Sequence, residues 1–283
     1  MGAGLLVLIL LVAAGYGGAL HPMGDSLAVF RAQGAAALML AAMLCLAARM
    51  GRAGLFGLVV AGLAAGPLIL AYSQTGDAGP YRLYQKNVLF RNDDLAGLEA
   101  DIREAAPDVL TLQEVSTENL PLLDGLADIL PHQHRCAYRP VGQVVVATRL
   151  TPVPGAAFCL LGMAGLQVKV PEGRIWLVSL HLSWPWPYRQ AAELDAMIPM
   201  LAGLDAPVVM AGDFNMVAWS SALRRVEAAT GSQLAGPVLG TLPSFGPLLT
   251  LPIDHVLAPR GGQVTLRPLA GSDHRGLLAD FAL

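Results

Sequence analysis

The sequence is organised around the stretch Pro207-Val208-Val209-Met210-Ala211-Gly212-Asp213-Phe214-Asn215. Residues 207–211 form a short apolar run rich in β-branched side chains, which is typical of a buried strand. The acid and the amide then stand at the carboxyl end of that strand, where α/β proteins usually place their chemistry. The i, i+2 spacing of Asp213 and Asn215 lets both side chains face one pocket. An ordinary strand followed by an Asx turn has the same pattern, so the rest of the chain has to decide.

The same arrangement recurs along the chain. Strand-like runs end at Asn87, Glu114 and His181, and a short apolar strand near the end of the chain contains Asp254. A turn at residues 271–276 then supplies another acid and another histidine. A buried carboxylate beside a histidine fixes its tautomer and favours the imidazolium, so we pair Asp254 with His274. The candidate site residues are Asn87, Glu114, His181, Asp213, Asn215, Asp254, Asp273 and His274.

The ligand types in this set indicate a hard divalent cation. Oxygen ligands in a chain with only three cysteines suit Mg²⁺ or Mn²⁺. Acids combined with histidines suit cleavage of a phosphodiester by metal-activated attack.

Composition separates the chain into two parts. It is 54% apolar and 14% charged, against about 25% charged in ordinary soluble proteins, so part of it is unlikely to lie in water. Residues 1–74 contain Asp25, Arg31, Arg49 and Arg52 as their charged residues, which leaves 15 basic and 20 acidic residues in the remainder. A soluble part with a net charge of −5 argues against non-specific nucleic-acid binding, which relies on Lys and Arg.

Three apolar segments in residues 1–72 predict transmembrane helices at about 3–20, 27–48 and 53–72. A signal peptide is the competing interpretation of the first segment. The second segment spans the membrane only if Arg31 extends its side chain to the interface. The charge of Arg31 is offset locally by Asp25. Arg49 and Arg52 lie between the second and third segments, so the positive-inside rule places them in the cytoplasm. We therefore expect an integral membrane protein, with residues 73–80 as a linker and residues 81–283 as a domain on the extracytoplasmic side. If the second segment does not span, this orientation inverts.

Six short stretches contain the candidate site residues: Gln85-Lys86-Asn87, Leu112-Gln113-Glu114-Val115, Ser179-Leu180-His181-Leu182, Gly212-Asp213-Phe214-Asn215, Ile253-Asp254-His255-Val256 and Ser272-Asp273-His274. Their order resembles the endonuclease/exonuclease/phosphatase superfamily, and with the apolar start the chain resembles bacterial membrane members of it. The resemblance implies a bacterial inner membrane with the catalytic domain on the periplasmic side. The resemblance implies a four-layer α/β sandwich over residues 81–283, with two packed mixed β-sheets flanked by helices. It also implies Mg²⁺ or Mn²⁺ held by Glu114, with Asn87 and Asp273 nearby.

The resemblance further implies catalytic roles. Asp213 would orient or deprotonate the attacking water, and Asn215 and His181 would contact the phosphate. His274, held by Asp254, would stabilise charge on the phosphoryl oxygens. In-line displacement at phosphorus needs a base, a Lewis acid and a cationic group, and this set supplies all three.

These features predict a membrane-anchored, divalent-metal-dependent phosphodiesterase acting on a lipid or another envelope-associated phosphodiester. The alternatives are an extracytoplasmic DNA or RNA endonuclease, an inositol-type phosphomonoesterase, and a non-catalytic binding module. A module without activity has no need to retain Glu114, Asp213, Asp254 and His274 together. The expected partners are a phosphate-ester substrate and a lipid bilayer; the sequence predicts no protein partner.

Some features leave alternatives open. The aromatic stretch at residues 183–188 follows His181 directly and would rest on a bilayer, stack a base or cap the core. Cys136 and Cys159 are either free thiols or, in an oxidising compartment, a disulfide. His132 and His134 form an H-x-H pattern, for which the alternatives are a metal site and a polar loop after Pro131; we interpret it as the loop.

Overall fold

The computed structural model describes residues 2–138, 141–247 and 249–283. The helices are α1 (Gly2–Ala14), α2 (Met23–Val29), α3 (Arg31–Ala47), α4 (Gly51–Ser73), α5 (Leu95–Ala105), α6 (Leu120–Gly125), α7 (Gln190–Ala202) and α8 (Ser221–Thr230). The strands are β1 (Tyr81–Asn87), β2 (Val109–Val115), β3 (His132–Ala137), β4 (Gln143–Thr148), β5 (Pro152–Leu160), β6 (Met163–Val170), β7 (Gly173–His181), β8 (Val208–Asp213), β9 (Gln233–Leu234), β10 (Leu242–Pro247), β11 (Thr250–Leu251), β12 (Asp254–Ala258), β13 (Gln263–Leu266) and β14 (Leu277–Phe281).

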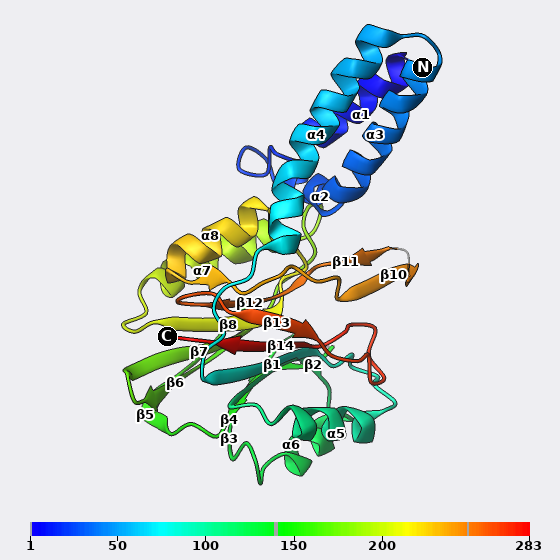
Figure 1. Ribbon diagram of the computed structural model, residues 1–283. Helices are drawn as coiled ribbons and strands as arrows, with labels where there is room; N and C mark the ends of the chain where they lie inside the picture. The colour runs from blue at the N-terminus through cyan, green and yellow to red at the C-terminus, as the bar shows by residue number, and fades with distance from the viewer. Residues whose placement is uncertain (1, 139–140, 248) are drawn as a thin grey trace.

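Two six-stranded sheets pack face to face in the C-terminal part of the chain (Figure 1). Their strand orders are β13-β14-β1-β2-β4-β3 and β5-β6-β7-β8-β12-β9. Each sheet is mixed, because β1 and β2 run parallel, as do β7 and β8, while their other neighbours are antiparallel. Helices α5 and α6 cover the outer face of the first sheet, and α7 and α8 cover that of the second (Figure 1). The predicted α/β sandwich with flanking helices is confirmed.

Local sequence signals set the ends of the covering helices. The Asp94 side chain accepts a hydrogen bond from the Gly97 N–H at 3.0 Å and starts α5, which ends where Ala106 adopts a left-handed conformation before Pro107. Ser220 caps α8 in the same way, and Gly231 ends it with φ +67°. The apolar faces of these helices pack on the outer faces of the sheets. The helices therefore do not cover the carboxyl ends of the strands, where the site lies.

The N-terminal helices α1–α4 differ from the predicted three spans. One described helix, α4, is long and apolar enough to cross a bilayer. Helix α1 covers only 13 residues, about 20 Å at 1.5 Å per residue, because the chain turns at the glycine-rich residues 15–18. The second predicted helix, 27–48, is interrupted at Phe30, where α2 and α3 meet at 69°; this bent pair counts as one further span at most. The set of three spanning helices is therefore not confirmed.

The bend between α2 and α3 has a tertiary cause. Arg31 does not extend to an interface as predicted; it is 5% exposed, donates to the Gly15 carbonyl and lies 3.8 Å over the Tyr16 ring. A buried guanidinium needs a hydrogen-bond acceptor and an aromatic face of this kind, and the bend between α2 and α3 places Arg31 beside both.

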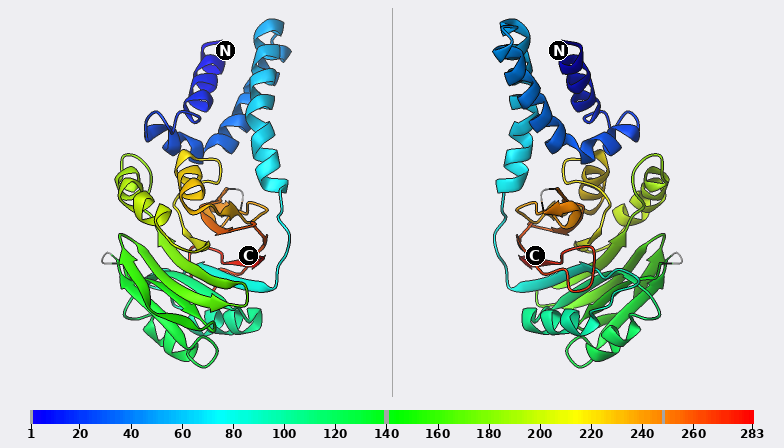
Figure 2. Two further views of the ribbon diagram at one scale, coloured as in Figure 1. Left: turned by 90° about the vertical axis from the view of Figure 1, so that its left-hand side faces the viewer. Right: turned by 90° about the vertical axis from the view of Figure 1, so that its right-hand side faces the viewer.

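Helix α2 is docked on the sandwich. The buried Asp25 carboxylate accepts hydrogen bonds from the N–H and Oγ of Ser221 at 2.8 and 2.5 Å, and from the Ala222 N–H at 3.2 Å. It therefore satisfies the first N–H groups of α8. The Trp219 indole donates to the Ala28 carbonyl at 2.8 Å. A single hydrophobic cluster runs from α1, α3 and α4 into the core under α7 and α8, so the helices and the sandwich form one packed body (Figure 2).

The predicted linker, residues 73–80, begins with the last residue of α4 and then follows the sandwich. Gly76 donates to the Gly262 carbonyl at 3.1 Å. A Cβ at Gly79 would lie 2.0 Å from the Phe281 carbonyl oxygen, so glycine is required for this close approach.

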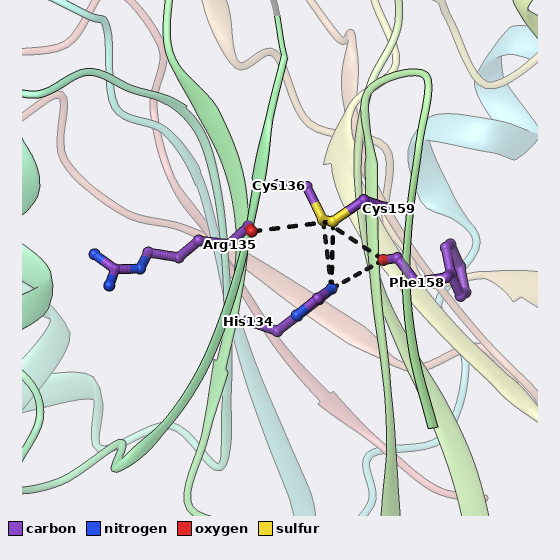
Figure 3. The surroundings of a disulfide bond; sticks show 5 residues. All are labelled: His134, Arg135, Cys136, Phe158 and Cys159. Atoms are coloured by element: carbon purple, nitrogen blue, oxygen red, sulfur yellow. Dashed lines mark hydrogen bonds between the residues drawn. A yellow bond between two sulfur atoms is a disulfide. The ribbon is translucent and has the colours of Figure 1, made fainter. Parts of the chain in front are cut away.

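The two sheets are joined at one edge by a disulfide. Cys136 of β3 and Cys159 of β5 are bonded, and these strands are the edges of opposite sheets (Figure 3). His134 lies beside the bond, with Nε2 2.9 Å from the Phe158 carbonyl oxygen. The open choice for the cysteines is thereby resolved in favour of a disulfide, and the predicted loop at His132 and His134 is wrong, because both lie in β3.

Candidate active site

Asp213 lies at the centre of the candidate active site. It ends β8, whose register places it beside His181 of the parallel strand β7 and opposite Asp254 of the antiparallel strand β12. Its Oδ2 atom is 3.6 Å from Nε2 of His181 and 3.8 Å from Nε2 of His274. All four side chains are buried. One carboxylate oxygen therefore faces two histidines.

Asp254 orients His274, as the sequence predicted. The Nδ1 of His274 donates to Asp254 Oδ2 at 2.7 Å, and Gln85 donates to the other carboxylate oxygen at 2.9 Å. Because Nδ1 is held in this way, Nε2 is the ring atom that faces Asp213.

Glu114 and Asn87 form a second part of the same site. The Asn87 amide donates to Glu114 Oε1 at 3.2 Å and to Asp213 Oδ2 at 3.1 Å. Glu114 Oε1 is also 3.9 Å from Nε2 of His181. The β2 register shifts between Leu112 and Val115, and Glu114 has φ +58°, a conformation that side chains other than glycine rarely adopt. Strained backbone of this kind often occurs where a side chain is aimed at a functional site.

Burial and neighbouring charges separate the pKa values of the central groups. Burial, with some repulsion from Asp254, raises the pKa of Asp213 to about 6. Burial alone would lower the pKa of His274, but the charges of Asp254 and Asp213 outweigh it and raise that pKa to about 10. The pKa of Asp254 is lowered, because the imidazolium and its hydrogen bond outweigh burial. Near neutral pH the site thus holds a carboxylate beside an imidazolium, one proton acceptor and one cationic donor.

Two predicted site residues, Asn215 and Asp273, are not placed as their predicted roles would require. Asn215 donates its backbone N–H to Asp213 Oδ1 and its side-chain amide to the Leu182 carbonyl, both at 2.8 Å, so it holds Asp213 in place. Its φ of +48° is one that asparagine tolerates. Asp273 is exposed, and no hydrogen bond or ion pair of its side chain to Asn87 or Glu114 occurs in the described chain. Phosphate contact by Asn215 and metal ligation by Asp273 stay predictions.

Several buried polar residues around the site were not predicted to have a role there. Gln85 donates to Gln113 at 2.9 Å, and Gln113 donates to Ser179 at 3.0 Å, which links the two sheets beneath the carboxylates. Lys86 donates to the carbonyls of Pro268, Leu269 and His274 at 2.6–2.8 Å and fixes the loop that carries His274. The position of Gln85 was a usable signal, because it stands two residues before Asn87 and side chains at i and i+2 share one face of a strand.

The aromatic stretch at residues 183–188 lies against the N-terminal helices. Trp184, Trp186 and Tyr188 are 39, 47 and 66% exposed, so the stretch does not serve as a cap on the core. The Trp186 carbonyl accepts a hydrogen bond from Ser26 Oγ at 2.6 Å, and the Trp186 ring centroid lies 6.2 Å from that of His21.

The donor set fits a hard divalent cation. Oxygen donors of Glu114 and Asp213 converge around the Asn87 amide, and Asp213, Asp254 and His274 offer ligand atoms that all lie within 4.8 Å of one another. Buried carboxylates this close together repel unless a cation or proton neutralises them. The described residues also include a second group, His134, Cys136 and Cys159, but its sulfur atoms are consumed by the disulfide.

Comparison with known proteins agrees with the fold described above. The sequence model of the Endonuclease/Exonuclease/phosphatase family matches residues 85–274. Truncated TDP2 from Caenorhabditis elegans superposes with a TM-score of 0.56 at 16% identity, over 70% of this chain and 96% of that one. An endonuclease/exonuclease/phosphatase from Beutenbergia cavernae gives 0.56 at 21%, over 70% of each chain. A family protein from Leptotrichia buccalis gives 0.56 at 14%, over 72% and 100%. No curated protein matches the sequence.

Proposed function

Because this chain belongs to the Endonuclease/Exonuclease/phosphatase family, we propose that it is a membrane-anchored, divalent-metal-dependent phosphodiesterase acting on a lipid or another envelope-associated phosphodiester. Members of the family are generally hydrolases of phosphate esters and depend on divalent metals. The observation that carries the proposal is the position of Asp213 between two histidines, one of which Asp254 orients.

The protonation states support hydrolysis by direct attack of water. Asp213 accepts a proton from a water molecule lying against its Oδ2 atom, since its pKa of about 6 leaves it ionised at neutral pH. His274 remains protonated and donates a hydrogen bond from Nε2 to a phosphoryl oxygen as negative charge develops there. His181 faces both Asp213 and Glu114 and contributes a second donor on the same side.

Glu114 and Asn87 are the residues that would hold the cation, and Asp273 is a further candidate ligand. When bound, Mg²⁺ or Mn²⁺ supplies Lewis-acid stabilisation of charge on the phosphate group. Asn215 keeps Asp213 aligned through the backbone hydrogen bond at 2.8 Å.

Exposed apolar side chains on the N-terminal helices support the membrane location. These side chains are 54–72% exposed, which is unfavourable in water for so many on neighbouring helices; they include Leu6, Val7, Leu10, Leu55, Phe56, Val59, Leu63, Ile69 and Leu70. The disulfide is typical of an oxidising compartment and supports an extracytoplasmic domain. The acidic sandwich and the exposed tryptophans favour a lipid over a nucleic-acid substrate.

The test uses full-length protein in lipid nanodiscs. Release of head-group phosphate from phospholipid, nicking of plasmid DNA and hydrolysis of p-nitrophenyl phosphate are measured side by side with Mg²⁺, Mn²⁺ or EDTA. We expect metal-dependent release from phospholipid that Glu114→Gln abolishes and that Glu104→Gln, an exposed carboxylate of α5, retains.

Other outcomes assign other functions. Plasmid nicking that Glu114→Gln abolishes identifies a nuclease, and activity on the monoester alone identifies a phosphomonoesterase. Activity on none of the three, with an intact fold, supports the binding module.

A further inference from the structure

A cavity of about 470 Å³ lies where the loop between α1 and α2, residues 15–22, meets α7 and α8. Leu20 and His21 line it from the loop, and Asp195, Arg224 and Arg225 line it from the two helices. None of these residues belongs to the candidate active site, which lies at the carboxyl ends of β1, β2, β7 and β8. The cavity is therefore separate from the place of hydrolysis.

The cavity has an excess of positive charge. Arg225 pairs with Asp195 at 2.6 Å, and both side chains are partly exposed. Arg224 donates one nitrogen to the Trp219 carbonyl at 3.0 Å, and no carboxylate of a described residue lies within 4.0 Å of its guanidinium. The first N–H groups of α8 are already used by Asp25, so an anion in this cavity would be bound by the guanidinium groups.

Exposed apolar and aromatic side chains lie on the segments that form or adjoin this cavity. Leu20 is 93% exposed on the loop that follows the apolar helix α1. Tyr16 and Trp186 are 46 and 47% exposed, on this loop and on the neighbouring stretch at residues 183–188. Aromatic side chains with a polar edge, together with arginines, are typical of the boundary between lipid and water.

The position of the cavity matches that boundary. The helices α1, α3 and α4 project from one side of the sandwich, and the loop between α1 and α2 lies at their end nearest the sandwich (Figure 2). A bilayer that surrounds the exposed apolar side chains of these helices would have its head groups at the level of this loop.

We propose that this cavity binds the head group of an anionic phospholipid, with Arg224 and Arg225 contacting the phosphate and Leu20 contacting the acyl region. The membrane location on which this rests is part of the proposed function, whereas the binding chemistry is independent of hydrolysis. Such a contact adds a second attachment of the sandwich to the bilayer besides the helices, and it would fix how the active site is oriented toward the membrane.

Binding is measured by titrating full-length protein in neutral detergent, with EDTA present, with dihexanoyl phosphatidylglycerol or dihexanoyl phosphatidylcholine below their micellar concentrations. We expect tighter binding of the anionic lipid, and a loss of about fivefold in its affinity for Arg224→Gln. Arg224→Lys keeps the charge and should retain most of the affinity. Arg174→Gln, at the opposite end of β7 from the site and paired with Asp205 at 3.9 Å, is the matched control and should bind normally.

Equal affinity for the two lipids, or an unchanged affinity in Arg224→Gln, overturns the proposal. Inorganic phosphate that binds as tightly as the lipid would also overturn it, because the site would then recognise any anion. If Arg224→Gln does not fold in a thermal unfolding assay, Arg225→Gln replaces it with the same expectation. Because lipid monomers and no divalent metal are used, neither a failure of membrane insertion nor a lack of hydrolysis changes these outcomes.

Discussion

Replacing Asp25 with alanine should destabilise the protein, although Asp25 lies far from the active site in the sequence. Its carboxylate accepts three hydrogen bonds at the start of α8, all of them buried. Loss of a helix cap costs about 0.5–2 kcal/mol, and each buried donor left without a partner costs about 1–3 kcal/mol. Since water can reach part of the vacated space, we expect a net loss of about 3 kcal/mol, which for a domain of this size lowers Tm by about 6–12 °C.

The assay is thermal unfolding of the full-length protein in detergent, followed by tryptophan fluorescence, since Trp219 lies in the same contact. Asp25→Asn keeps an acceptor for the α8 N–H groups and should lose about a third as much stability. The control is Asp195→Ala, which removes an exposed carboxylate and should lower stability by less than about 1 kcal/mol. If Asp25→Ala and Asp195→Ala shift Tm equally, the contact of Asp25 with α8 does not stabilise the fold by the expected free energy.

Four further predictions concern the site and the disulfide. Asp254→Asn should lower kcat by about 10²–10⁴-fold and move the alkaline limb of the rate profile from about pH 10 toward 6.5, because His274 loses the charge that raises its pKa; an unmoved limb would contradict this pairing. The raised pKa of His274 stabilises the folded protein below pH 6.5, and this stabilisation is lost as pH rises through about 10. Urea unfolding across that range should show the loss in the wild type and not in Asp254→Asn. At saturating metal, the rate of the wild type should fall about tenfold per pH unit on an acidic limb at or below about pH 6, where Asp213 becomes protonated; a rate that stays the same down to pH 4 would exclude Asp213 as the base. Cys136→Ser combined with Cys159→Ser should cost about 3 kcal/mol of stability while the initial rate at 25 °C changes less than about twofold, and a large loss of rate would show that the disulfide shapes the site directly.

Much of the sandwich and the core of the site could be predicted because their signals are local. Strands β1, β7 and β8 end at Asn87, His181 and Asp213, and β2 carries Glu114 one residue before its end. The parallel pairing of β1 with β2 and of β7 with β8 brings these ends together within each sheet. Asp254 was identifiable because a carboxylate inside an apolar strand needs a partner, and His274 is that partner at 2.7 Å.

The predictions that the structure contradicts depend on contacts between residues far apart in the sequence. Asp25 was expected to offset Arg31 within the same connection, but it binds the start of α8, 196 residues later. Arg31 is buried against Tyr16, which bends a segment whose composition alone predicts a continuous helix. Strand β3 was missed because an edge strand is recognised by its neighbour and its disulfide more than by its own polar residues.

The central claim is that Asp213 is the base of a metal-dependent phosphodiesterase, and its most direct test is the initial rate of bis(p-nitrophenyl) phosphate hydrolysis. Full-length wild type, Asp213→Asn and Asp280→Asn are compared at pH 7.5 with saturating Mg²⁺ or Mn²⁺. Asp280 of β14 pairs with Arg82 through a partly exposed side chain and serves as the matched carboxylate control. We predict that Asp213→Asn lowers the rate by about 10²–10⁴-fold while Asp280→Asn stays within about twofold of wild type. A folded Asp213→Asn variant with the wild-type rate would contradict the account.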